Sequence, residues 1–350
     1  MDTFALKPTI YFGENALSVL ERLSGKRVLV ITDAFLAASS MMEQVREHLR
    51  GCTVSVFDRV VPDPHLELVA HGVQTMREFQ PEVILAFGGG SPMDCAKAIR
   101  WSGGGSAKLW AVPTTAGTGS EMTSFAVLTD EEKGVKYPLV DETLIPDVAV
   151  LDPSLLAGVP AQVTADTGID VIAHAVEAYV AVGATAFSDA LAEKAFVLAW
   201  QNLPGAYRSK GESEEKGTML YASCLAGMAF QSAGLGICHS LSHALGGRLH
   251  MPHGRLNGIC LPKVIMYNAA NPAAARRYSK LAALCGLAPN PRALAGGLGR
   301  MLTALNMPKT LAVDEPSAIA AAAREDRCTA ANPVTPSAGD LEKILRELGR

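Results

Sequence analysis

The sequence predicts a Rossmann-like α/β domain over residues 1–160, followed by an all-helical domain over residues 161–350. Three observations support this division. Before residue 153, short β-branched runs alternate with segments of helical spacing, as in a parallel sheet whose strands are linked by helices. From Thr164 onward, alanine-rich segments with helical spacing follow one another without a convincing strand. The length of 350 residues also suits two domains, because single cores stop growing at about 250–300 residues.

The expected strands of the first domain are short, continuous apolar runs. Such runs are typical of strands that helices cover on both faces of a parallel sheet. They are KRVLVITD (26–33), TVSVFD (53–58), PEVILAFGGG (81–90), KLWAVPTT (108–115) and DVAVLDP (147–153), with a hairpin over 125–140.

The helices expected in the second domain include AHAVEAY, DALAEKAFVLAW, ASCLAGMAF, HSLSHALGG and AAARRYSKLAALCG. The last segment, 337–349, places Leu341, Ile344, Leu345 and Leu348 on one stripe, so we expect it to pack on its own domain.

Composition and charge exclude several classes of function. Hydrophobic residues make up 49% of the chain and the net charge is −4, with lysine and arginine dispersed, so we expect neither nucleic acid nor a membrane as partner. The N-terminus does not resemble a signal peptide, and no apolar run approaches the roughly 18 residues of a membrane span. Seven cysteines without a C-x-x-C motif are typical of a reducing cytoplasm.

A glycine-rich loop follows the third expected strand in VILAFGGGSPMDCAKAI. Ser91 suits a helix N-cap, Pro92 the first helical position and Asp94 a capping-box acid. Glycine lets the backbone approach a ligand closely, and a helix N-terminus offers free N–H groups to phosphate. We therefore expect Gly89, Gly90, Ser91 and Asp94 at a pyrophosphate site.

A second loop, VPTTAGTGSE (112–121), follows the next strand and adds the hydroxyls of Thr114, Thr115 and Thr118. Either loop alone is better explained as a tight turn without a ligand. Two such loops at the strand ends of one sheet favour a nucleotide, because ligands bind at those ends in α/β proteins.

Asp33 ends the first expected strand, where no G-x-G-x-x-G fingerprint occurs. Its carboxylate could accept bonds from a ribose hydroxyl and would repel a 2′-phosphate, which favours NAD over NADP. An Asx turn at the strand end is an almost equally good explanation.

Four of the eight histidines lie within GICHSLSHALGGRLHMPHG (236–254). His239 and His243 share one helix face at i, i+4, as do Asp170 and His174, and His253 lies beside a turn. Each feature alone has an ordinary explanation, a core histidine or a surface hydrogen bond. Together they suit a divalent metal such as Fe²⁺ or Zn²⁺, with five candidates for about four ligand positions.

With these motifs in place, the chain resembles the iron-containing (group III) alcohol dehydrogenases over nearly its whole length. The resemblance rests on GGGSPMDCAK, PTTAGTGSE, LIPDVAVLDP and the long signatures around 164–182 and 236–257. Within the family, TFALKPTIYFG, DAFLAASSMM and DALAEKAFVLAW are most similar to 1-propanol dehydrogenases of bacterial microcompartments. The resemblance implies the dehydroquinate synthase-like fold, with a nucleotide-binding α/β domain and an all-α metal-binding domain.

The resemblance also implies roles for single residues. His243 matches a position near the nicotinamide and becomes the candidate catalytic residue, while Lys136 matches a lysine that contacts the ribose. His250 stands where many relatives carry an aromatic residue, which suggests a contact at the substrate pocket rather than catalysis. The ligand positions of the family fall on Asp170, His174, His239 and His253.

The activity implied is reversible hydride transfer between NAD(H) and a short-chain primary alcohol or aldehyde, such as 1-propanol/propanal or ethanol/acetaldehyde. Such an enzyme would regenerate NAD⁺ by reducing the aldehyde, as a cytoplasmic homodimer or larger homo-oligomer, with microcompartment enzymes or shell proteins as further partners. Two alternatives stay open. One is an NAD- and metal-dependent lyase or cyclase of the dehydroquinate synthase type, and the other is a shell-associated binding protein without turnover.

Overall fold

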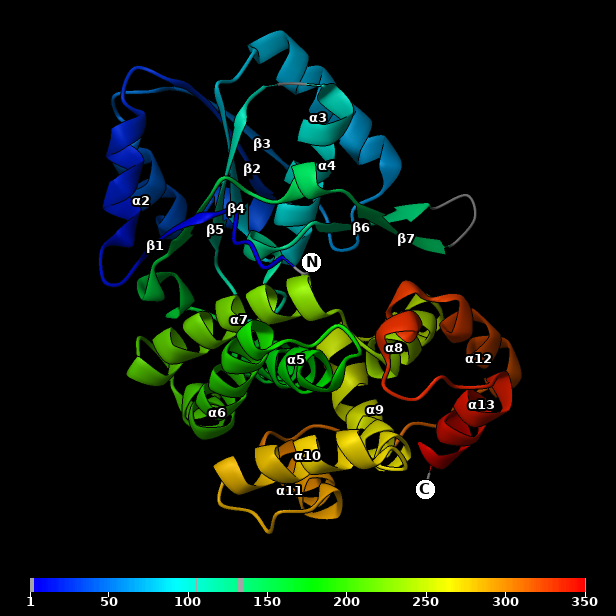
Figure 1. Cartoon of the computed structure of the whole chain (residues 1–350). Coiled ribbons are helices and arrows are strands. Elements are labelled where there is room, and N and C mark those ends of the chain that lie inside the picture. The colour runs from blue at the N-terminus through cyan, green and yellow to red at the C-terminus, as the bar shows by residue number, and fades with distance from the viewer. Residues whose placement is uncertain (1–2, 105, 131–134, 350) are drawn as a thin grey trace. The chain divides into compact units, whose positions relative to one another are not determined.

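The computed structural model describes residues 3–104, 106–130 and 135–349, with the side chains of 130–137 outside this description. By their internal contacts the residues form two compact units, Met1–Val159 and Pro160–Arg350. The first unit is α/β and the second is helical (Figure 1), so the expected fold class is confirmed.

The described part of the first unit contains a six-stranded parallel sheet in the order β1-β8-β5-β4-β2-β3. The sequence predicted every strand of this sheet except β1, a short edge strand whose residues are only partly buried and therefore lack a continuous apolar run. The strands are β1 (Thr9–Phe12), β2 (Arg27–Asp33), β3 (Thr53–Val60), β4 (Val83–Gly88), β5 (Lys108–Pro113) and β8 (Val148–Leu151), with the expected hairpin formed by β6 (Phe125–Asp130) and β7 (Val135–Val140).

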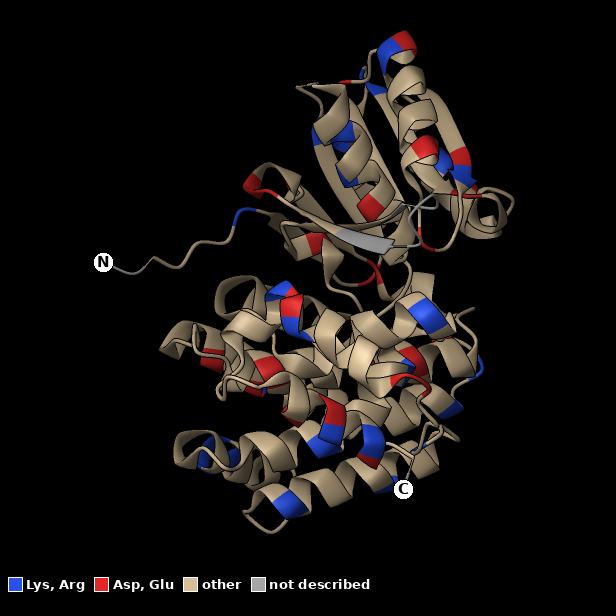
Figure 2. Ribbon diagram, turned by 90° about the vertical axis from the view of Figure 1, so that its right-hand side faces the viewer, with Lys and Arg blue, Asp and Glu red and all other residues tan. Residues whose placement is uncertain are grey.

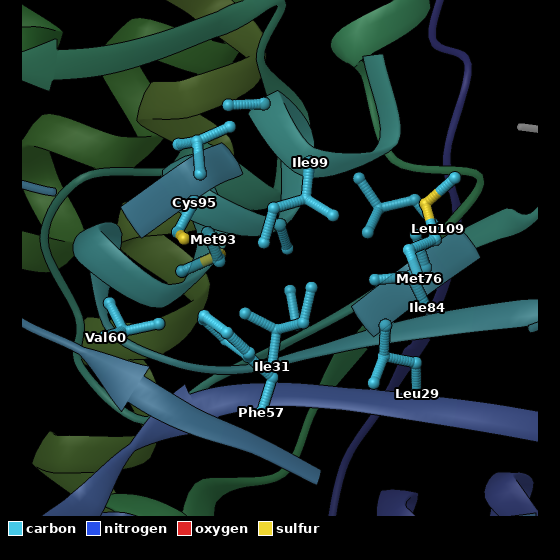
Figure 3. Packing of buried hydrophobic residues seen from close by; sticks show 14 of the residues in the cluster. Leu29, Ile31, Phe57, Val60, Met76, Ile84, Met93, Cys95, Ile99 and Leu109 are labelled. Atoms are coloured by element: carbon cyan, nitrogen blue, oxygen red, sulfur yellow. The ribbon is translucent and has the colours of Figure 1, made fainter. Parts of the chain in front are cut away.

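Alternate residues of the central strands point to opposite faces of the sheet. On one face, Leu29, Ile84 and Leu109 belong to a core cluster that α3 and α4 complete with Met76 and Ile99 (Figure 3). The helices of this unit are α1 (Ala34–Ala37), α2 (Ser40–His48), α3 (Leu66–Phe79) and α4 (Gly90–Gly103), with 3₁₀ turns η1 (Ala16–Leu23), η2 (Ser120–Met122), η3 (Glu142–Leu144) and η4 (Pro153–Leu156).

Helix α5 (Ala161–Val180) is the central element of the second unit, buried from Thr164 to Val180 except at Thr167 and packed against α6, α7 and α9. The remaining helices are α6 (Ala186–Arg208), α7 (Glu214–Ala233), α8 (Ile237–Leu249), α9 (His253–Asn268), α10 (Pro272–Leu284), α11 (Pro291–Ala304), α12 (Pro316–Glu325) and α13 (Ala338–Glu347), with the 3₁₀ turn η5 (Arg327–Ala331). No strand follows β8 among the described residues. The amphipathic C-terminal segment forms α13, whose apolar stripe packs within this unit as expected.

Figure 2 shows Lys and Arg mixed with Asp and Glu in both units, in agreement with the dispersed charges of the sequence. Among the described residues, no single helix is long and apolar enough to cross a membrane. Of these helices, only α7 and α8 taken together meet the criteria of length and composition, and they are bent by 105° at the break between them.

The first unit also buries charged side chains between α4 and the segment that follows β5. Lys97, with no exposed surface, donates from Nζ to Ser120 Oγ at 2.7 Å and to the Phe125 carbonyl at 2.8 Å. Nearby Glu121 is 1% exposed, and its Oε1 has no hydrogen-bond partner among the described residues. Burial raises the pKa of the Glu121 carboxyl to about 7 and lowers the pKa of the Lys97 ammonium to about 8.

The buried Glu121 predicts a pH-dependent stability. Because its folded-state pKa lies above the ordinary value, its contribution to stability is present below about pH 4.5 and is lost as the pH rises towards about 7. Glu121→Gln keeps the shape without the ionisation and should reduce the fall in melting temperature between pH 5 and pH 8. Glu78→Gln, at an exposed position on α3, is the matched control and should leave the pH dependence of the melting temperature unchanged. An unaltered pH dependence in Glu121→Gln would contradict this account.

Candidate functional site

Three helices of the second unit bring the predicted metal-binding residues together. Asp170 and His174 lie one turn apart on α5, and each is 4% exposed. His239 lies in the first turn of α8, is 1% exposed, and has its ring stacked on His174 with centroids 4.6 Å apart. His253 is the first residue of α9, half-buried, with its ring centroid 5.3 Å from that of His239.

The donor atoms of this group converge. One ligand atom from each of Asp170, His174 and His239 lies within 4.8 Å of the others. Nε2 of His239 and Nε2 of His253 each lie 3.8 Å from Oδ1 of Asp170. Ligands bound at about 2.0–2.2 Å around one ion are separated by about 3–4 Å, so a carboxylate with three imidazoles fits a divalent transition metal.

A close approach of α9 to α5 places His253 at this cluster. A Cβ on Gly254 would lie 1.9 Å from the backbone oxygen of Asp166 and 3.0 Å from Cβ of Asp170. Only glycine allows this contact. Arg255, the next residue, forms two hydrogen bonds to the Asp166 carboxylate at 2.8 and 3.0 Å, which holds the start of α9 against α5.

His243 lies one turn after His239 in α8 but has a different environment. Its side chain is 33% exposed, and its Nδ1 lies 2.9 Å from Oδ2 of Asp326. Burial alone would raise the pKa of Asp326, but the hydrogen bond and charge of His243 hold it well below the usual range. The ring of His243 stacks on His253 with centroids 5.0 Å apart, so it borders the cluster.

The remaining histidine of this segment, His250, adopts a left-handed conformation with φ of 51° and ends α8. Its backbone N–H donates to the Gly246 carbonyl, and its side chain is exposed. The structure therefore gives His250 a role in terminating the helix.

The sequence analysis did not identify Asn257, which is fully buried on α9 one turn after His253. Its Nδ2 lies 2.7 Å from Oδ1 of Asp170, 3.2 Å from Nε2 of His239 and 3.1 Å from Nε2 of His253. The i, i+4 spacing from His253 was the available signal. Glu177 and Asp326, which contact His239 and His243, were also missed.

In the first unit, the glycine loop ends β4 and begins α4 two residues earlier than expected. The N-cap is Gly89 rather than Ser91, and no side chain caps the helix. Gly88 has φ of 148°, which only glycine adopts easily, and this turn lets the helix start early. Within the described ranges, no side chain accepts from the first N–H groups of α4, a property of anion-binding helix ends.

The second loop lies against the first. A Cβ on Gly89 would lie 3.1 Å from Oγ1 of Thr115, and one on Gly90 would lie 2.8 Å from Cγ2 of Thr118. The N–H of Thr114 donates to the Gly88 carbonyl at 3.0 Å. These contacts gather the two predicted cofactor loops at the carboxyl ends of β4 and β5.

Two further cofactor candidates have structural partners. Asp94 accepts from Ser120 Oγ at 2.9 Å and from the N–H of Val127 at 3.0 Å, which ties α4 to β6. Asp33 caps α1, with Oδ1 accepting from the N–H of Leu36 at 2.8 Å, so its local structural role is that of a helix cap rather than the Asx turn considered from the sequence. The side chain of Lys136 falls outside the described residues.

Two family sequence models match the chain, the iron-containing alcohol dehydrogenase model over residues 7–153 and the C-terminal model of the same family over residues 164–349. The chain belongs to the iron-containing alcohol dehydrogenase family. It is therefore an oxidoreductase of alcohols and carbonyl compounds, and this membership does not favour the lyase or the non-catalytic alternative.

Individual members of the iron-containing alcohol dehydrogenases resemble it closely. The 1-propanol dehydrogenase PduQ of Salmonella typhimurium is 47% identical over 294 residues, which cover 83% of this chain and 80% of that protein. The iron-containing alcohol dehydrogenase of Thermococcus thioreducens superposes with a TM-score of 0.93 at 31% identity, covering 99% of both chains. Sulfoacetaldehyde reductase of Bifidobacterium kashiwanohense, solved with NAD⁺, gives 0.90 at 27% identity, covering 99% of this chain and 98% of that one.

The packing at Gly254 predicts a sensitive position. Gly254→Ala must push α9 away from backbone atoms of α5, so we expect a loss of about 1–3 kcal/mol in stability and a lower metal content. Gly247→Ala, in α8 with nothing within 4 Å of the added methyl group, is the control and should be neutral or slightly stabilising. Calorimetry and metal analysis of both variants check this prediction. Equal stability and equal metal content of the two variants would contradict the close packing at Gly254.

Proposed function

We propose that the protein is a metal-dependent, NAD(H)-linked dehydrogenase that interconverts a short-chain aldehyde and its primary alcohol, with reduction of the aldehyde as the main direction. The observation that carries this proposal is the convergence of buried Asp170, His174 and His239 with half-buried His253 in one cluster. Membership in the iron-containing alcohol dehydrogenase family supports the same activity.

In this proposal the four residues hold Fe²⁺, with Zn²⁺ as an alternative. A bound divalent metal supplies a Lewis acid that polarises a carbonyl oxygen and stabilises a developing alkoxide. Burial lowers the pKa of His239 well below its ordinary value, which keeps this imidazole neutral and able to coordinate.

His243 is proposed as the catalytic residue that moves the proton. Its hydrogen bond to Asp326 occupies Nδ1 and favours the tautomer in which Nε2 carries a lone pair. A half-buried imidazole oriented in this way can exchange a proton with the substrate oxygen through Nε2. His243 would act beside the metal-binding residues without being a ligand.

NAD(H) is proposed to bind at the ends of β4 and β5. The uncapped start of α4 at Gly89, Gly90 and Ser91 suits the pyrophosphate, with Thr114, Thr115 and Thr118 alongside. Asp94 acts there by fixing the loop through Ser120. Asp33 and Lys136 are proposed to contact the ribose, with Asp33 using the oxygen that does not cap α1.

Similarity to relatives supports the proposals for substrate, location and assembly. The similarity to 1-propanol dehydrogenase PduQ supports propanal and 1-propanol as substrates, and acetaldehyde and ethanol are the next smaller pair. We propose a cytoplasmic homodimer or larger homo-oligomer, enclosed with partner enzymes or shell proteins in a bacterial microcompartment.

The decisive experiment measures NADH oxidation with propanal after anaerobic loading with Fe²⁺. Metal-dependent turnover that yields 1-propanol and NAD⁺ in equal amounts is expected. NAD⁺ that stays bound and is regenerated in each cycle would indicate lyase or cyclase chemistry, and metal binding without turnover would indicate a binding protein.

The two histidines of α8 should respond differently to replacement. We expect His239→Ala to lose at least tenfold in metal occupancy, as should alanine at Asp170, His174 or His253. His243→Ala should retain about one metal per chain and lose about 100-fold or more in kcat, because a proton-transfer group is missing. Metal content beside steady-state kinetics checks this. Loss of metal from His243→Ala would contradict the division of roles.

Asp33 should control the choice of cofactor. Its charge repels a 2′-phosphate, so NADH should be preferred over NADPH in kcat/KM. Asp33→Asn can keep the cap on α1 while removing the charge, and should narrow the preference by about tenfold, equivalent to ~1.4 kcal/mol. Equal use of both cofactors by the unaltered enzyme would remove Asp33 from the ribose site.

A further inference from the structure

Helix α5 carries a third inward-facing polar residue, Glu177, which is not among the proposed ligands. It follows Asp170 and His174 at i+7 and i+3, on the same helix face, and is 2% exposed. Its carboxylate meets the start of α8, where Oε2 lies 2.6 Å from Nδ1 of His239.

The same carboxylate accepts three backbone N–H groups. Oε1 accepts from Cys238 at 2.7 Å, and Oε2 accepts from Gly236 at 3.0 Å and from His239 at 3.3 Å. Helix α8 has no side-chain cap of its own, so a carboxylate from α5 replaces the missing acceptor and complements the positive helix end.

Glycine at position 236 makes this approach possible. A Cβ there would lie 2.7 Å from Oε1 of Glu177, in the space that the carboxylate occupies. The first turn of α8 is therefore held against α5 by one buried side chain.

These bonds also determine which nitrogen of His239 carries the proton. The Glu177 carboxylate accepts three backbone N–H groups, and a fourth donor completes this arrangement, so the geometry assigns the proton of His239 to Nδ1. Nε2 then keeps its lone pair, and this atom lies 3.8 Å from Oδ1 of Asp170. A ligating histidine whose other nitrogen is fixed by a carboxylate is oriented and made more basic.

We propose that Glu177 is the positioning residue of the metal site: it locks His239 in the coordinating tautomer and fixes α8 so that Nε2 points at the other ligands. This inference rests on the metal site of the proposed function. Glu177 acts through His239 and is not itself a ligand.

Glu177→Gln tests the proposal. An amide oxygen cannot accept from all four donors, so either a backbone N–H of α8 loses its partner or Nδ1 of His239 accepts a hydrogen bond from the amide N–H and Nε2 carries the proton. We expect the affinity for Zn²⁺, measured by competition with a chromogenic chelator, to fall about 10- to 100-fold. The absorption spectrum of the Co²⁺-loaded protein should change as well.

Glu121→Gln is the matched control because it also neutralises a buried glutamate, in the other unit. Its Zn²⁺ affinity should equal that of the unaltered protein. If Glu177→Gln does not fold, Gly236→Ala offers a second route, because its methyl group displaces the carboxylate. Gly247→Ala is the control for that change.

The outcomes separate the inference from the proposed function. A lower melting temperature of metal-free Glu177→Gln with unchanged Zn²⁺ affinity and Co²⁺ spectrum would overturn the positioning role and leave only a helix cap. Absence of stoichiometric metal binding by the unaltered protein would instead overturn the metal site. Neither readout depends on alcohol dehydrogenase activity.

Discussion

Acidic and imidazole side chains on a buried helix need hydrogen-bond or ionic partners inside the protein. Helix α5 carries such side chains, so the helices around it must supply those partners. Its inward face presents Asp170, His174 and Glu177 to the starts of α8 and α9. Buried polar groups cost stability unless they are paired, and the N-terminal turns of α8 and α9 supply partners to both carboxylates. Gly236 and Gly254 are the positions where the approach leaves no room for a side chain.

The same constraint explains why two histidines one turn apart on α8 differ. His239 is 1% exposed and meets Glu177, while the side chain of His243 is 33% exposed and meets Asp326. In each case a carboxylate takes Nδ1 and leaves Nε2 for chemistry. The difference in burial agrees with the roles proposed for the two histidines. A neutral, enclosed imidazole such as that of His239 suits metal coordination, and a partly exposed one such as that of His243 suits proton exchange.

Local patterns in the sequence predicted most of the fold. The continuous apolar runs of β2, β4 and β5 and the repeated helical spacing after Thr164 were sufficient for the two-part architecture. Strand β1 was not predicted because an exposed edge strand does not require apolar residues. The early start of α4 was not predicted because the pattern of side chains does not indicate the backbone conformation of Gly88.

The candidate site was predictable only where its residues share a helix. Asp170 with His174, and His239 with His243, are visible as i, i+4 pairs, whereas the whole ligand set came from family resemblance. The carboxylates that orient the histidines are distant in sequence, 62 residues for Glu177 and His239 and 83 for His243 and Asp326. No local spacing signals such pairs, because folding alone brings them together.

Charge balance gives the last reason to regard the cluster as a metal site. In the first unit, half-buried Asp94 lies near the ammonium group of buried Lys97; burial disfavours both charges, and each charge favours the ionised form of the other. In the second unit, Asp170 lies near the imidazoles of His239 and His253, and Glu177 lies near that of His239, whose pKa burial lowers well below the ordinary value. Neutral imidazoles do not offset the charge of a buried carboxylate, and burial raises the pKa of Glu177 to about 7. A divalent cation at the proposed metal site would offset carboxylate charge there, whereas a lysine or arginine side chain would fill the space proposed for the substrate oxygen.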